Sequence, residues 1–175
     1  ITAGTWVLDP THTEIGFTVR HIMSKVRGKF ETFEGTLVTA EDITASTVSV
    51  SVDLSSINTG TADRDNHLRS GDFFNIETHP TMTFATTGVV QKSDTDFVVT
   101  GDLKIKDITK SVDLAVEFLG EGKDPWGGTR VGVEATTVIS RKDWGIDFNI
   151  PLEGDKVMIG DKITITINAE AVLQA

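Results

Sequence analysis

A two-residue alternation of apolar and polar side chains runs through most of this chain. In TVSVSVDL, residues 47–54, the valines and the leucine fall on one side, and hydroxyl or acidic side chains fall on the other. This period is typical of a β-strand with one buried and one solvent-facing side. Strands of parallel sheets show continuous apolar runs instead, so the pattern predicts an antiparallel sheet of about eight or nine strands. The alternating runs lie at residues 15–21, 47–54, 97–105, 112–118, 131–135 and 163–170.

The apolar side of such a sheet must be covered, and the sequence offers no long amphipathic helix for this. The sheet must therefore pack against itself as a sandwich or close into a barrel. The inward residues are mostly Val, Ile, Leu, Ala and Gly. A barrel of about eight strands with such modest side chains leaves room for one apolar ligand. The residue pattern alone leaves both architectures open. The length of 175 residues fits one domain spanning residues 1–175.

Helix is scarce in this sequence. The best candidate lies between Thr59 and Gly71, where Thr59 or Thr61 would cap the first turn and Gly71 would end the helix. Its few apolar residues suffice to cover a small opening. HIMSKVRG, residues 21–28, predicts a second short helical turn. GKDPWGGTR predicts a hairpin loop with Trp126 at its tip.

Charge and composition exclude several classes of function. The chain has a formal net charge of −10 and no cysteine. Nucleic-acid binding needs clustered basic residues, so we expect no nucleic-acid partner, and the same charge argues against electrostatic docking on anionic membranes. No apolar run approaches the roughly 18 residues of a spanning helix, so no stable membrane insertion is expected. No signal peptide is recognisable, which favours the cytoplasm, with the periplasm or secretion as alternatives. A homodimer through an exposed strand edge stays open.

A polar cluster lies on the predicted helix, in RDNHLRSGDFFN. It contains Arg64, Asp65 and His67. An acid–base group is one interpretation, because histidine titrates near neutral pH, and contact with a ligand headgroup is another. We expect a scaffold role, in which these side chains bond loop backbone. His21 is in phase with inward residues and fits either a core histidine or a contact to a ligand's polar end. The four histidines form no H-x-H or H-x-x-x-H pair, so neither a metal nor a cofactor is expected.

Four blocks of residues stand out between about Trp6 and Val172. The first carries Trp6, Asp9, His12, Phe17, His21, Gly28, Phe30, Phe33 and Gly35, and the second carries Thr59, Gly60, Arg64, Asp65, His67, Leu68, Phe73, Phe74, Pro80 and Phe84. The third is GDLKIKDITKSV, and the fourth is SRKDWGID. Together these blocks resemble the YceI-like family of polyisoprenoid-binding proteins. Thr13 stands where the family often has Ser, and Trp144 stands where it often has Phe.

The resemblance implies an all-β fold, an antiparallel lipocalin-like β-barrel of about eight strands with one or two short helices. It also implies binding of a long-chain isoprenoid lipid in the interior, for transport, storage or sequestration, without enzymatic activity. The alternatives are a small hydrolase or isomerase that uses His21 or His67 as base, and a structural β-domain that binds only protein. The residues expected to contact the lipid are Ile15, Phe17, Val19, His21, Phe30, Val50, Val52, Arg64, His67, Leu68, Phe73, Phe74, Met82, Phe84, Leu103, Ile105, Val133 and Trp144.

Overall fold

The computed structural model describes residues 1–154 and 156–175, and these residues form one antiparallel sheet. The alternating runs are strands, as predicted. In β8, for example, the inward residues Phe97, Val99, Leu103 and Ile105 are buried, and Asp102 and Lys104 between them are exposed. The strands are β1 (Gly4–Leu8), β2 (Glu14–His21), β3 (Ser24–Phe30), β4 (Phe33–Thr39), β5 (Thr47–Asp53), β6 (Ile57–Asn58), β7 (Thr81–Gln91), β8 (Asp96–Ile105), β9 (Ile108–Lys123), β10 (Thr129–Ser140) and β11 (Ile159–Leu173).

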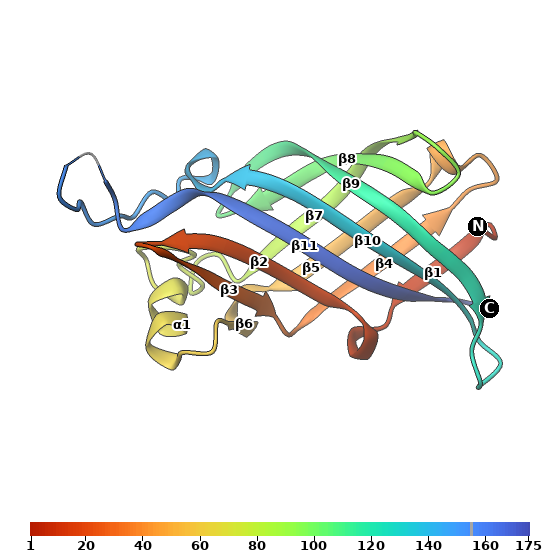
Figure 1. Ribbon diagram of the computed structural model, residues 1–175. Helices are drawn as coiled ribbons and strands as arrows, with labels where there is room; N and C mark the ends of the chain where they lie inside the picture. The colour runs from red at the N-terminus through yellow and green to blue at the C-terminus, as the bar shows by residue number, and fades with distance from the viewer. Residues whose placement is uncertain (155) are drawn as a thin grey trace.

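Eight of these strands close into a barrel, which decides between the sandwich and the barrel. The order is β1-β4-β5-β7-β8-β9-β10-β11, and β1 also pairs with β11. Along its edge away from β10, the long strand β11 pairs with two strands. Its residues Ala171–Leu173 pair with β1, whereas Ile159–Asn168 pair with β2. The strands β2, β3 and β6 therefore extend the wall at one end of the barrel. Both chain termini lie at the other end (Figure 1).

The helix α1 (Ala62–Arg69) lies at the end extended by β2, β3 and β6 (Figure 1). Its position agrees with the sequence, but its capping differs. The helix begins after Thr61, whose side chain makes no capping hydrogen bond. Instead, Asp65 is buried and accepts hydrogen bonds from the backbone N–H and the hydroxyl of Thr59. Short 3₁₀ turns complete the helical structure: η1 (Pro10–His12), η2 (Ile43–Ala45), η3 (Leu54–Ser56) and η4 (Arg141–Trp144).

The helical turn predicted at residues 21–28 is wrong. This segment is the hairpin that joins β2 to β3, with Val19 opposite Val26 and His21 opposite Ser24. The two-residue alternation continues through it, and pairing with the neighbouring strand stabilises it more than a single helical turn could. The loop of GKDPWGGTR is a hairpin turn as predicted. It is shorter than expected, because β9 continues to Lys123.

Two glycines keep large rings against the barrel wall. The ring of Phe17 lies over Gly28 in the neighbouring strand, and the ring of Phe84 lies over Gly101. A Cβ atom at either glycine would collide with the ring. Because glycine has no side chain, each phenylalanine lies flat along the sheet instead of projecting into the interior. The missing side chains therefore preserve empty space inside the barrel.

Candidate ligand tunnel

The barrel encloses two adjoining apolar cavities, each of about 180 Å³. The first, the mouth cavity, lies beside α1, and the second, the inner cavity, lies between the walls formed by β5, β7, β10 and β11. Met82 and Ile165 line both cavities, so the two hollows meet across these side chains. Methionine is flexible and fills irregular gaps. Of the two shared side chains, Met82 is therefore the one that can more readily change shape. The two adjoining cavities are here called the tunnel.

Every residue expected to contact a ligand lies on the wall of one of these cavities. Met82 lies on both. The mouth cavity is lined by Phe17, Val19, His21, Phe30, Arg64, His67, Leu68, Phe73, Phe74, Ile105 and Trp144, and the inner cavity by Ile15, Val50, Val52, Phe84, Leu103 and Val133.

The sequence analysis missed part of the wall. Ile163, Ile165 and Ile167 line the cavities and follow the alternation of β11, so their phase alone could have identified them. Ile146 and Met158 also line the mouth cavity, but they lie in irregular backbone at residues 145–154 and 156–158. No periodic pattern marks such positions.

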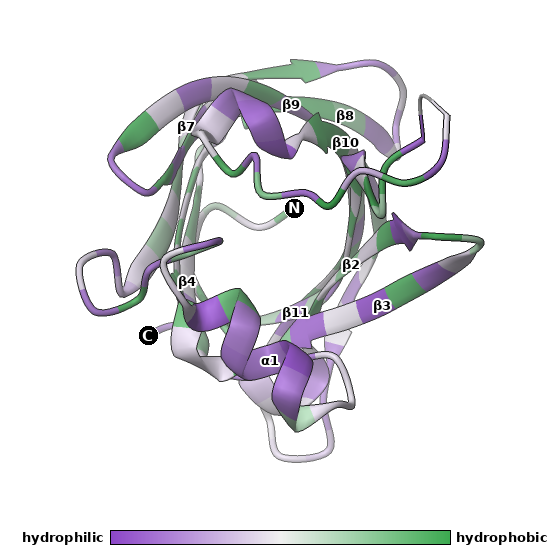
Figure 2. Cartoon of the chain, turned by 90° about the vertical axis from the view of Figure 1, so that its left-hand side faces the viewer, coloured by the Kyte–Doolittle hydropathy of each residue, from purple (hydrophilic) through white to green (hydrophobic). Residues whose placement is uncertain are grey.

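Polar groups at the mouth are largely bonded to the protein itself. The Arg64 guanidinium donates to the hydroxyl and the carbonyl of Thr59, at 2.7 Å each. Asp65, on the same helix, accepts from Thr59 as well. Both charged side chains therefore converge on Thr59, in the loop before α1. Together they fix the helix at the rim of this end of the barrel, where Figure 2 shows it.

His67 bonds to another side chain at the surface and not to the backbone of a loop. Its Nε2 lies 2.8 Å from Asp72 Oδ2, and both side chains are about half exposed. The imidazole ring also packs edge-on against the rings of Phe73 and Phe148. His67 therefore has a polar edge in contact with solvent and a ring that forms part of the apolar mouth.

Arg141 is a buried cation that the sequence analysis did not identify. Its guanidinium donates to the backbone carbonyls of Gly160, Ile146, Phe148 and Ile159. Burial lowers its pKa, an effect that the nearby carboxylates of Asp161 and Asp147 oppose. These bonds tie η4 and the irregular segment after it to the start of β11. Arg141 thus stabilises a side of the mouth that no regular strand pairing holds.

The far end of the barrel is closed by packing and by ion pairs. Trp6 is fully buried beside Val131 and Ala171, and its indole N–H donates to Thr39 Oγ1 at 2.9 Å. On the outer side, Arg130 Nη1 lies 2.6 Å from Asp9 Oδ2 and 3.3 Å from Glu170 Oε2. This end therefore joins β1, β10 and β11 with both apolar and charged contacts.

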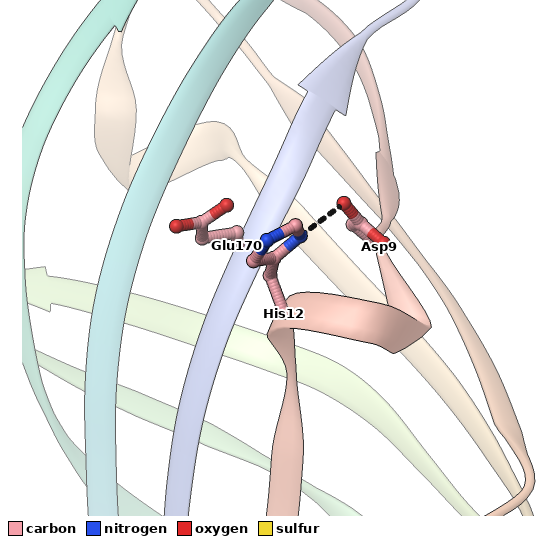
Figure 3. A group of neighbouring side chains, drawn as sticks. All are labelled: Asp9, His12 and Glu170. Carbon is pink, nitrogen blue, oxygen red and sulfur yellow. Dashed lines mark hydrogen bonds and ion pairs between the residues drawn. The ribbon is translucent and has the colours of Figure 1, made fainter. Parts of the chain in front are cut away.

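The same outer cluster has the donor atoms of a potential metal site. Ligand atoms of Asp9, His12 and Glu170 lie within 4.8 Å of one another (Figure 3). Arg130 already places a cation among these carboxylates. Its guanidinium, followed by His12 and Thr11, holds the pKa of Asp9 well below its usual value. The cluster therefore acts as an internal ion-pair network.

No helix among residues 1–154 and 156–175 is long and apolar enough to cross a bilayer. The barrel fold has clear counterparts among solved structures. BcnA from Burkholderia cenocepacia superposes with a TM-score of 0.82 at 16% identity, covering 93% of this chain and 98% of that one. A polyisoprenoid binding domain from Saccharophagus degradans superposes with a TM-score of 0.71 at 16% identity, covering 99% and 100%. At this identity the likeness establishes the fold.

Sequence relatives establish the family. The UPF0312 protein of Azotobacter vinelandii is 37% identical over 176 residues, covering 98% of this chain and 88% of the relative. A UPF0312 protein of Vibrio vulnificus is 41% identical over 156 residues, covering 87% and 80%. The model of the YceI-like domain matches residues 6–171. The chain therefore belongs to the YceI-like family.

Proposed function

We propose that this protein binds a polyisoprenoid, or a similar long-chain isoprenoid lipid, inside the barrel. The observation that carries the proposal is the pair of apolar cavities that meet at Met82 and Ile165. A bulky, compact ligand would fit one cavity. A long, thin and flexible hydrocarbon can occupy both, because it can pass beside a methionine side chain that changes rotamer.

The chemistry of the wall suits a ligand tail without hydrogen-bonding groups. Ligand sites usually combine apolar walls with a few polar groups that orient the ligand. Here the charged and imidazole side chains that line the tunnel lie on the mouth cavity, namely His21, Arg64, His67 and Arg141. The polar residues on the wall of the inner cavity are Thr36 and Thr83. Burying one methylene contributes about 0.8 kcal/mol, so each five-carbon unit gains roughly 3–4 kcal/mol before the cost of ordering the chain. Several units would offset that ordering cost.

The comparison with S. degradans supports the same ligand class, since the structure that shares this fold is described as a polyisoprenoid binding domain. The protein would act as a single-domain carrier that transports, stores or sequesters the lipid, without chemical conversion. An enzyme acting on the same lipid would need a base at the mouth. The pair of His67 and Asp72 is the group with the geometry for this role.

Ligand length provides the sharpest test. Purified protein is loaded in detergent with farnesol as the short probe and undecaprenol as the long one, and native mass spectrometry reads the complexes. We expect wild type to bind both. Met82→Trp should lose undecaprenol and retain farnesol, because a rigid indole would separate the cavities. Met82→Ala should retain both, and Val90→Trp, which changes an exposed residue of the same strand, serves as the control.

Two outcomes would overturn the proposal. One is that wild type binds neither probe and that organic extraction of purified protein yields no isoprenoid lipid. The other is that Met82→Trp binds undecaprenol as well as wild type does. Conversion of the bound lipid by wild type, lost in His67→Ala while binding persists, would establish the enzyme instead of the carrier.

A further inference from the structure

The β2–β3 hairpin has a charge opposite to that of the whole molecule. Residues 15–30, here called the basic hairpin, contain Arg20, Lys25, Arg27 and Lys29, whereas the chain has a net charge of −10. The one acidic residue of the two strands is Glu14, at the end of β2 that lies away from the hairpin tip. All four cationic side chains are exposed. The molecule therefore has a local basic surface although its net charge is negative.

The pairing of the strands concentrates this charge. Arg20 lies directly opposite Lys25, and Arg27 lies opposite Thr18. Like charges directly opposite on one face of a sheet destabilise it. Among residues 1–154 and 156–175, none of these four cations forms an ion pair. An external anion would relieve the repulsion that the hairpin itself leaves uncompensated.

The tip of the basic hairpin is apolar and strained. Ile22 has a φ of 53°, which β-branched residues rarely adopt. Its side chain is 49% exposed, and that of Met23 is 91% exposed. Polar residues or glycine would fit such a turn with less strain and less exposed hydrocarbon. The sequence thus presents two large apolar side chains to solvent at a position that disfavours them.

This tip belongs to the mouth of the tunnel. The backbone N–H of Ile22 donates to the carbonyl of Met158 at 2.7 Å, and Met158 lines the mouth cavity. Two more exposed apolar residues, Ile150 and Val157, lie in the segment before Met158. The inward side of the hairpin contributes further wall residues to the same cavity: Phe17, Val19, His21 and Val26. Exposed and enclosed apolar side chains therefore occur on one element.

We infer that the basic hairpin docks on an anionic phospholipid bilayer, with Ile22 and Met23 inserted at the interface and the four cations on the headgroups. This inference rests on the proposed function, since an isoprenoid lipid has to leave a bilayer to enter the tunnel. Peripheral binding combines buried apolar area with attraction of Lys and Arg to anionic lipid. Nucleic acid would use the cations but would gain nothing from an aliphatic tip. The docked state holds the tunnel mouth against the membrane without a spanning segment.

Vesicle flotation tests the inference with the full chain. Vesicles of phosphatidylcholine alone are compared with vesicles of phosphatidylcholine and phosphatidylglycerol in equal parts. We expect flotation with the anionic vesicles and its loss at high salt. Each Lys or Arg near the surface changes partitioning about fivefold, so Lys25→Gln with Arg27→Gln should weaken it roughly 25-fold. Met23→Ser should weaken it about tenfold through lost apolar burial.

Matched controls change the same residue types elsewhere. Lys92→Gln with Lys104→Gln removes two exposed lysines outside the basic hairpin. Trp126→Ser removes the exposed aromatic side chain at the tip of the β9–β10 hairpin. Both should float as wild type does. Wild type that floats equally on neutral and anionic vesicles, or on neither, would overturn the inference. So would hairpin variants that float as well as the controls.

Loading with undecaprenol in detergent separates this inference from the proposed function. Hairpin variants that load normally but do not float support docking as a step distinct from binding. If wild type loads normally and does not float, docking is wrong and the tunnel function stands. If wild type fails to load undecaprenol in detergent, the proposed function is wrong. Docking as a step of isoprenoid uptake is then wrong as well.

Discussion

The two ends of the barrel are built from different kinds of interaction. At the end with the termini, β1 pairs with both β4 and β11, and a fully buried Trp6 lies beneath an ion-pair network. At the other end, a short polar helix and irregular segments surround the mouth cavity. Continuous strand pairing around a buried tryptophan holds one end together, whereas separable local contacts hold the other. A barrel that must admit a ligand needs this asymmetry, because elements that open are drawn from the less stable parts of a fold.

The largest expected effect is at the closed end. Trp6→Ala should lower the free energy of unfolding by about 3–5 kcal/mol, because it leaves a large cavity in a packed site. Chemical denaturation measures this, and Trp126→Ala, on an exposed tip, should change it by no more than about 0.5 kcal/mol. At denaturant concentrations below its unfolding transition, the Trp6→Ala variant should still load isoprenoid. If Trp6→Ala lowered the free energy of unfolding by less than about 1 kcal/mol, Trp6 would not be what holds this end together.

A smaller effect is expected where α1 is attached to the mouth. Asp65→Ala removes a buried carboxylate that accepts two hydrogen bonds from Thr59, and the loss should be about 1.5–3 kcal/mol. Asp63→Ala removes an exposed carboxylate from the same helical turn and should cost less than about 1 kcal/mol. Hydrogen exchange should then become faster in α1 and stay unchanged in β1 and β4. Equal acceleration at both ends would contradict the proposed independence of the two regions.

The tunnel itself should respond with a change in binding more than in stability. In Gly28→Ala, the new methyl group must displace the ring of Phe17 towards the interior. We expect undecaprenol loading to fall while the free energy of unfolding changes by about 1 kcal/mol or less, because a flexible ring moves and the backbone does not. Gly122→Ala, where the added group meets open space, is the control. Unchanged loading in Gly28→Ala would mean that the ring of Phe17 does not limit the hollow.

The smallest effect concerns acid stability at the closed end. The pKa of Asp9 is lower in the folded protein than in the unfolded chain, chiefly because of Arg130. The unfolded chain therefore takes up a proton first as the pH falls below about 4, and the stability that Asp9 contributes at neutral pH is lost there. Asp9→Asn should be less stable than wild type at pH 7, with the difference shrinking in acid. Asp94→Asn, in an exposed turn, should follow wild type at every pH.

Much of this architecture could be predicted from residue alternation, because alternation records which side of a strand is buried. It predicted β2, β5, β8, β9, β10 and β11, and inward residues that became tunnel wall, such as Val52 and Leu103. It could not decide between a sandwich and a barrel, because that depends on whether β1 meets β11. For that choice the family resemblance was decisive.

The remaining parts depend on contacts between distant residues or on irregular backbone. Arg130 and Asp9 are 121 residues apart in the sequence, and no local pattern connects them. Ile146 and Met158 reach the tunnel from a segment without periodicity. The basic hairpin was overlooked for another reason: a net charge averages over the whole surface, whereas docking depends on the charge of one patch.

A crystal structure of the protein loaded with undecaprenol tests the central claim most directly. We predict elongated density that enters beside α1, passes Met82 and Ile165, and ends below Trp6, with both cavities occupied. Cavities filled by the protein's own side chains, or density confined to the outer surface of the barrel, would contradict it.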